Sequence, residues 1–133
     1  MRRFVVVLGV LALLSIATPA EARPTYYRDQ ARDVAADMGC RGFRADEEPG
    51  TYSRGKCRAA GKRLTVVIFR NATQQAKWNA TVDTLLQAYY PPGRYYYAEA
   101  AGAIVGAKTF SRSAARLATR RLDGARVRVV RVN

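Results

Sequence analysis

The sequence predicts an α+β fold: a two-layer sandwich in which a mostly antiparallel sheet carries helices on one face. Apolar residues recur at helical spacing in three segments, β-branched apolar runs lie between them, and no linker, repeat or low-complexity tract interrupts the chain. The resulting order is α-β-β-α-β-β-α-β. Its last two thirds match the β-α-β-β-α-β order of a ferredoxin-like motif, preceded by an N-terminal helix.

Residues 1–22 have the pattern of a secretory signal peptide. Met1-Arg2-Arg3 is a basic start, an uncharged run then extends to Ala20, and Ala20-Glu21-Ala22 is a small-residue cleavage pattern. The run contains Pro19 and falls short of the roughly 20 apolar residues of a membrane span, which disfavours an uncleaved anchor. We therefore expect an exported protein, secreted or held at the cell envelope, with one small domain over residues 23–133.

The first helix is predicted over residues 24–39, with Thr25 as its N-cap and Gly39 just past its end. Its apolar face at helical spacing comprises Tyr27, Ala31, Val34, Ala35 and Met38.

Cys40 and Cys57 are the only cysteines, and an even count in an exported chain predicts a disulfide between them. In the chain-entropy model, closing a loop of this size contributes about 3 kcal/mol. The chain has no histidine, so the common zinc sites cannot form, and the cysteine spacing differs from a Cys-x-x-Cys redox motif.

The clearest strand is RLTVVIF, residues 63–69, which is β-branched and apolar on both faces. Strands of this kind are usually central in their sheet. A polar turn is expected at residues 46–50. Further strands are predicted over residues 51–57, 94–100, 103–110 and 125–132, the middle two as a hairpin.

The second and third helices carry recognisable end signals. Asn71 with Gln74 resembles a capping box, and Pro91-Pro92-Gly93 stops the second helix. Ser111 opens the third helix and Gly124 closes it.

The run from Cys40 to Gly124 resembles a group of small exported actinobacterial proteins of unknown function. In that group a cysteine pair precedes a strand ending in Phe, and then come a helix bearing Trp, a glycine-containing hairpin, an alanine-rich helix and a last strand. The matching features are Cys40, Cys57, VVIF, Trp78, Gly102 or Gly106, and SAARLATRRLDGARVRVV. Ile104 stands where members tend to have Trp. The resemblance implies the fold and an exported location, and no activity.

Catalytic candidates are scarce. Without histidine, the usual general base and the Ser-His-Asp triad are excluded. Asp46, Glu47 and Glu48 adjoin one another on a turn, which indicates a solvated loop rather than paired catalytic carboxylates. We therefore expect a non-catalytic protein without cofactor or metal, and a small enzyme is the least favoured alternative.

The charge is the more informative signal, because the chain carries a formal net charge of +13. Arginines on the third helix and last strand predict an anion-binding surface: Arg112, Arg116, Arg120, Arg121, Arg126 and Arg128. A second basic cluster surrounds the second cysteine and comprises Arg54, Lys56, Arg58, Lys62 and Arg63. Arginine outnumbers lysine 19 to 4, so the alternative is a solvated face in the arginine-rich proteome of a bacterium with a GC-rich genome.

Two classes of partner follow from these features. The first is an anionic envelope polymer, glycan, lipid surface or extracellular polyanion, bound through the arginines. The second is a protein, to which the chain would act as ligand or inhibitor by presenting the loop between Cys40 and Cys57, with residues 43–55 in contact.

The run YYPPGRYYY, residues 89–97, is a weaker candidate surface. Because side chains alternate along a strand, Tyr95 and Tyr97 point to the face opposite Tyr96. If that face is open, the Tyr95 and Tyr97 pair can stack on sugar rings or bases. The alternative is that the tyrosines pack within the sheet.

Overall fold

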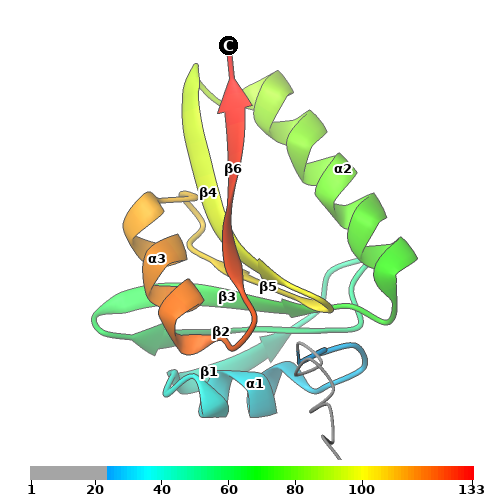
Figure 1. The fold of residues 1–133 in the computed structure, drawn as a ribbon, viewed down its shortest axis with the longest axis vertical. Coiled ribbons are helices and arrows are strands. Elements are labelled where there is room, and N and C mark those ends of the chain that lie inside the picture. Colours follow the sequence, from blue (N-terminus) through cyan, green and yellow to red (C-terminus); the bar gives the residue numbers. More distant parts are fainter. Residues whose placement is uncertain (1–23) are drawn as a thin grey trace, which may run out of the picture.

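The computed structural model describes residues 24–133 and shows an α+β protein, a sheet-and-helix sandwich (Figure 1). The predicted signal peptide lies outside these residues. The elements are α1 (Ala31–Asp37), β1 (Arg41–Asp46), β2 (Ser53–Ala59), β3 (Lys62–Ile68), α2 (Ala72–Tyr89), β4 (Gly93–Ala100), β5 (Ala103–Gly106), α3 (Arg112–Arg121) and β6 (Arg126–Val132).

The sheet in the described part of the chain has six antiparallel strands in the order β1-β2-β3-β5-β4-β6. β3 is central, as its apolar residues on both faces predicted. The β4–β5 hairpin turns at Ala101 and Gly102, also as predicted. β1 was not predicted, because RGFRAD is polar and its six residues are exposed or only partly buried.

The helices pack on both faces of the sheet, so the predicted placement of all helices on one face is wrong. α1 and α3 cover the face formed by Leu64, Val66 and Val105, which we call the closed face. α2 packs on the opposite face, where its Val82 and Leu86 meet Val67, Tyr97 and Ile104. We call this second face the open face, because α2 lies over only part of it (Figure 1).

The hand of the crossovers explains this placement. α2 links β3 to β4 and α3 links β5 to β6, and in each case the linked strands are parallel with one strand between them. Both crossovers step in the same direction along the sheet, but they start from strands of opposite polarity. Since such crossovers are almost always right-handed, α2 and α3 must lie on opposite faces.

The ferredoxin-like arrangement is not confirmed at the level of the sheet. The elements from β3 to β6 do follow the β-α-β-β-α-β order along the chain. In a ferredoxin-like sheet, however, the last strand lies beside the first strand of the motif, which here is β3. β2 already occupies that flank of β3, so β6 pairs with β4 instead, at the other end of the sheet.

The ends of the helices test the predicted caps. Asn71 accepts a hydrogen bond from the Gln74 backbone N–H at 2.9 Å, and Ser111 accepts one from Ala114 at 3.3 Å. The prediction that Thr25 caps the first helix is wrong, because α1 begins at Ala31. The preceding residues form a turn in which Arg28 has a φ of 63°, outside the helical region.

The disulfide between Cys40 and Cys57 is present, and it is buried on the closed face. It joins the segment between α1 and β1 to the middle of β2. The residue that follows each cysteine is an arginine, so the bridge also fixes Arg41 beside Arg58 in the register of β1 and β2.

Candidate anion-binding face

Five basic residues project from β1, β2 and β3 on the part of the open face that α2 does not cover. The period of two along each strand places them on one side, together with Thr65 and Val67. We call this set the basic face: Arg41, Arg44, Lys56, Arg58 and Arg63.

The register sets like charges opposite one another. Arg58 of β2 lies opposite Arg41 of β1 and Arg63 of β3, which gives a row of three arginines across three strands. Lys56 lies opposite Arg44 in a second row. Like charges directly opposite on neighbouring strands destabilise a sheet. We therefore expect these facing pairs to lower the stability of the fold.

A hollow accompanies these rows. It has a volume of about 620 Å³ and is lined by the basic face together with Gly42, Ala45, Asp46 and Cys57. A register shift between Arg41 and Arg44 marks a β-bulge, and Gly42 within it has a φ of 65°. Bulges re-aim the side chains of a strand, and here the bulge keeps both arginines on the side of the hollow.

Acidic residues neutralise only one end of this face. Arg54 forms ion pairs with Asp46 at 2.6 Å and with Glu48 at 3.0 Å, and Lys56 lies 3.9 Å from Asp46. Among residues 24–133, no ion pair is found for Arg58 or the arginines opposite it. The end of the face near the disulfide therefore presents uncompensated positive charge.

The predicted arginine surface of the third helix and last strand is not one surface. Four of its residues lie exposed on α3: Arg112, Arg116, Arg120 and Arg121. Arg126 and Arg128 project from β6 on the opposite side of the sheet, in register with Glu99 and Tyr97. Strand alternation separates them from α3, because α3 packs on the closed face.

Arg128 is already occupied within the fold. Its guanidinium donates a hydrogen bond to Asp83 of α2 at 2.9 Å and lies 3.8 Å from Glu99. It also stacks 5.7 Å from the ring centre of Tyr97. Arg128 therefore ties α2 to the sheet, and its predicted role in anion binding stays a prediction.

Arg121 is the member of α3 that approaches the basic face. It lines a second hollow of about 480 Å³ together with Arg41 and Arg58. Its guanidinium donates a hydrogen bond to the carbonyl oxygen of Met38 at 3.3 Å. The basic edge of the molecule near the disulfide thus extends from β1 and β2 to the end of α3.

The predicted aromatic surface of Tyr95 and Tyr97 is wrong. Tyr97 is buried beneath α2, its hydroxyl donates to Asn79 at 3.0 Å, and its ring packs edge-on against Trp78. Burial raises the pKa of the Tyr97 hydroxyl well above its ordinary value, although Arg128 opposes the shift. The hydroxyl of Tyr95 donates to the carbonyl oxygen of Pro91 at 2.6 Å, so it too serves the fold.

The segment between the two cysteines is not a free loop. Residues 43–55 contain most of β1, the start of β2 and the turn between them. The turn is held to the sheet by a hydrogen bond from the Tyr52 backbone N–H to the Ile68 carbonyl oxygen at 2.8 Å. A partner protein would therefore meet a hairpin that is paired within the sheet.

The sequence predicted three members of the basic face, Lys56, Arg58 and Arg63, and missed Arg41 and Arg44. These two belong to β1, the strand that was not predicted. One signal pointed to Arg41: a bridge between Cys40 and Cys57 brings the two residues that follow the cysteines close together. Of the other predicted members, Arg54 is held by carboxylates, and Lys62 is absent from the lining of the hollow.

No protein-family model, curated protein or solved structure matches this chain. The resemblance to exported actinobacterial proteins therefore stays a prediction. Within residues 24–133, no helix is both long enough and apolar enough to cross a membrane.

Proposed function

We propose that the protein is an exported, non-catalytic module that binds an anionic polymer of the cell envelope through the basic face. One observation carries this proposal: the row of Arg41, Arg58 and Arg63 across three strands, uncompensated by any acidic residue of the described chain. A row of like charges is unfavourable in the free protein and becomes favourable when anions lie between its members.

The spacing of the basic face suits a polymer with repeated charges. Neighbouring strands are about 4.8 Å apart, so the three arginines of the row offer guanidinium groups over about 10 Å. Each guanidinium presents paired N–H donors that match two oxygens of a phosphate or carboxylate. A polymer lying across the strands would meet Arg41, Arg58 and Arg63 in succession.

Two double variants with the same change in charge test the proposal. Arg58→Glu with Arg63→Glu reverses two members of the row, and Arg116→Glu with Arg120→Glu reverses two exposed arginines of α3. The binding of long-chain polyphosphate and of a double-stranded DNA oligonucleotide is measured between 50 and 200 mM salt. On DNA, log affinity falls as log salt concentration rises. The magnitude of this negative slope should be smaller by about 2 for the first variant, because two contacts with phosphate are lost. The second variant should bind nearly as the natural protein does.

Three results would overturn the proposal. Equal losses in both variants would show that net charge, and not this face, governs binding. A loss confined to the α3 variant would assign the anion site to the third helix. Binding to an envelope protein that resists salt and survives both charge reversals would favour the role of protein ligand or inhibitor.

A further inference from the structure

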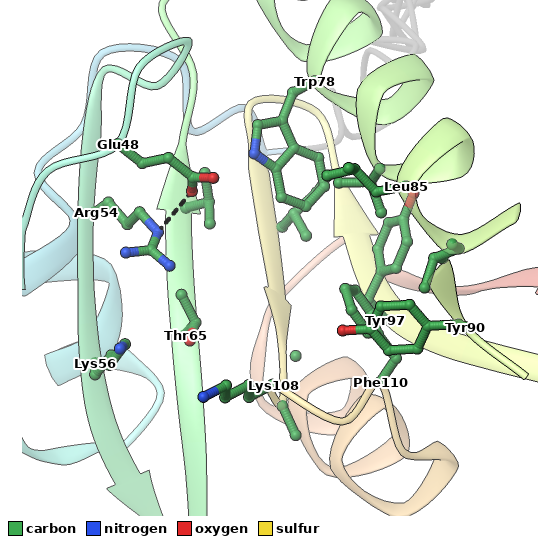
Figure 2. Close-up of a pocket in the computed structure, with 16 residues that line it drawn as sticks. Glu48, Arg54, Lys56, Thr65, Trp78, Leu85, Tyr90, Tyr97, Lys108 and Phe110 are labelled. Carbon is green, nitrogen blue, oxygen red and sulfur yellow. Dashed lines mark ion pairs between the residues drawn. The ribbon is translucent and has the colours of Figure 1, made fainter. Parts of the chain in front are cut away.

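A third hollow, on the same side of the sheet as the basic face, lies beneath α2 and differs chemically from that face (Figure 2). It has a volume of about 290 Å³, near the lower end of the range for small-molecule sites. α2 forms one wall, and β3 and β5 form the floor. This groove contacts the basic face at Lys56.

The interior of the groove is apolar and aromatic. It is lined by Val67, Trp78, Val82, Leu86, Ile104 and Phe110. Two further apolar side chains stand at its mouth, where Leu85 is 47% exposed and Tyr90 is 36% exposed. Exposed apolar residues that continue into a hollow mark a surface for an apolar ligand rather than a satisfied core.

The remaining rim of the groove has a net positive charge, because three basic side chains line it against the single carboxylate of Glu48. Lys56 from β2 and Lys108 from the segment after β5 both line it, and Figure 2 shows their ammonium groups pointing toward each other, with Thr65 nearby. Arg54 also reaches the rim, but Asp46 and Glu48 engage it. In residues 24–133 no ion pair is found for Lys108. Lys108 therefore supplies positive charge that no carboxylate of the described residues pairs, while the charge of Lys56 is partly offset by Asp46 at 3.9 Å.

We infer that the groove binds a single-chain anionic amphiphile, namely a long-chain fatty acid. Its carboxylate would lie between Lys56 and Lys108, within reach of the Thr65 hydroxyl, and its acyl chain would lie under α2 against Trp78 and Val82. The combination of an apolar interior with a positively charged rim at one end selects this ligand over a neutral lipid, which leaves Lys108 unpaired, and over a polymer, which leaves the interior empty. This site goes beyond the proposed function and shares only Lys56 with the basic face.

The single tryptophan of the chain provides the measurement, because Trp78 lines the groove. The natural protein is titrated with a fatty acid that carries bromine on its acyl chain, below its micelle concentration, and the fluorescence of Trp78 is recorded. Bromine quenches an indole only in contact with it, so saturable quenching is expected. In competition with unbrominated fatty acids, affinity should rise about fourfold for each added methylene until the groove is filled.

Three variants locate the ligand. Thr65→Phe fills the groove and should abolish the quenching, while the binding of polyphosphate to the basic face is retained. Lys108→Glu should weaken binding of the fatty acid at least tenfold. Lys77→Glu, an equal charge change at an exposed position of α2 outside the groove, should leave binding unchanged. Thermal melts of all three variants establish that they fold.

The inference is overturned if quenching is absent or does not saturate. It is also overturned if the brominated methyl ester binds as tightly as the acid. The ester has no negative charge, so equal affinity would show that the lysines do not bind the carboxylate. Full quenching in a folded Thr65→Phe variant would place the acyl chain elsewhere. Since polyphosphate binding is measured separately, failure of this site leaves the proposal for the basic face standing, and the reverse also holds.

Discussion

The two faces of the six-stranded sheet differ in how far helices cover them and in which residues they carry. The closed face is covered by α1 and α3 and is filled with small and branched apolar residues such as Ala98, Ala103 and Val105, each almost fully buried. The open face is covered by α2 on one part only, and the rest carries arginine and lysine. The apolar cluster of the closed face and the cluster beneath α2 stabilise the fold, while the uncovered part of the open face keeps like charges side by side.

The largest expected effect comes from two neighbouring residues of β3 that point to different faces. Leu64 is buried on the closed face, so Leu64→Ala should lower the free energy of unfolding by about 4 kcal/mol. Thr65 lies beside it on the partly exposed open face, and Thr65→Ala should change stability by no more than about 0.5 kcal/mol. Urea unfolding of both variants checks this pair. Similar losses of unfolding free energy in the two variants would show that the two positions contribute equally to stability.

The next largest effect is expected from removal of the disulfide, which is buried on the closed face and positions Arg41 on the open face. Replacing both cysteines by alanine should cost about 3 kcal/mol in the chain-entropy model. Because the bridge holds Arg41 beside Arg58, the variant should also bind polyphosphate more weakly, even where it remains folded. Calorimetry and the binding assay, run together, check both effects. Full affinity in the variant would mean that the strand pairing alone sets the position of Arg41.

The smallest effect has the opposite sign. Arg58→Glu places a carboxylate between Arg41 and Arg63, so it should stabilise the fold by about 0.5 kcal/mol while weakening the binding of polyanions. Lys77→Glu makes the same charge change on α2, with no charged residue three or four positions away, and should shift stability less. Thermal melts at low salt compare the two. A destabilised Arg58→Glu variant would contradict the view that repulsion among Arg41, Arg58 and Arg63 lowers the stability of the free protein.

Local signals in the sequence predicted most of the elements but not their arrangement. The caps at Asn71 and Ser111 and the central strand β3 depend on neighbouring residues, and they were predicted. Whether α2 and α3 share a face depends on the position of β6 at the far end of the sheet, which local patterns do not encode. One signal was nevertheless present, because a strand with apolar residues on both faces, such as Val66 and Val67, needs cover on both sides.

The candidate site was harder to predict than the fold, because it consists of charged residues on polar strands. Arg41 and Arg44 lie on a strand without an apolar alternation, so periodicity could not identify them. The arginines of α3 and β6 formed the denser cluster in the sequence, yet strand alternation and the ion pair of Arg128 with Asp83 divide them in space. Density of charge along a chain is therefore a poor guide to density of charge on a surface.

Within residues 24–133, β1 and β6 form the two edges of the sheet, and each leaves backbone donors and acceptors free to pair with another chain. Such edges invite strand addition between molecules and so promote aggregation, unless charges or bulges interrupt them. β6 carries Arg126, Arg128 and Arg131 along its length, and β1 has the bulge between Arg41 and Arg44. The arginines along β6 and the bulge in β1 thus disfavour the addition of a strand from a second copy of this protein at either edge.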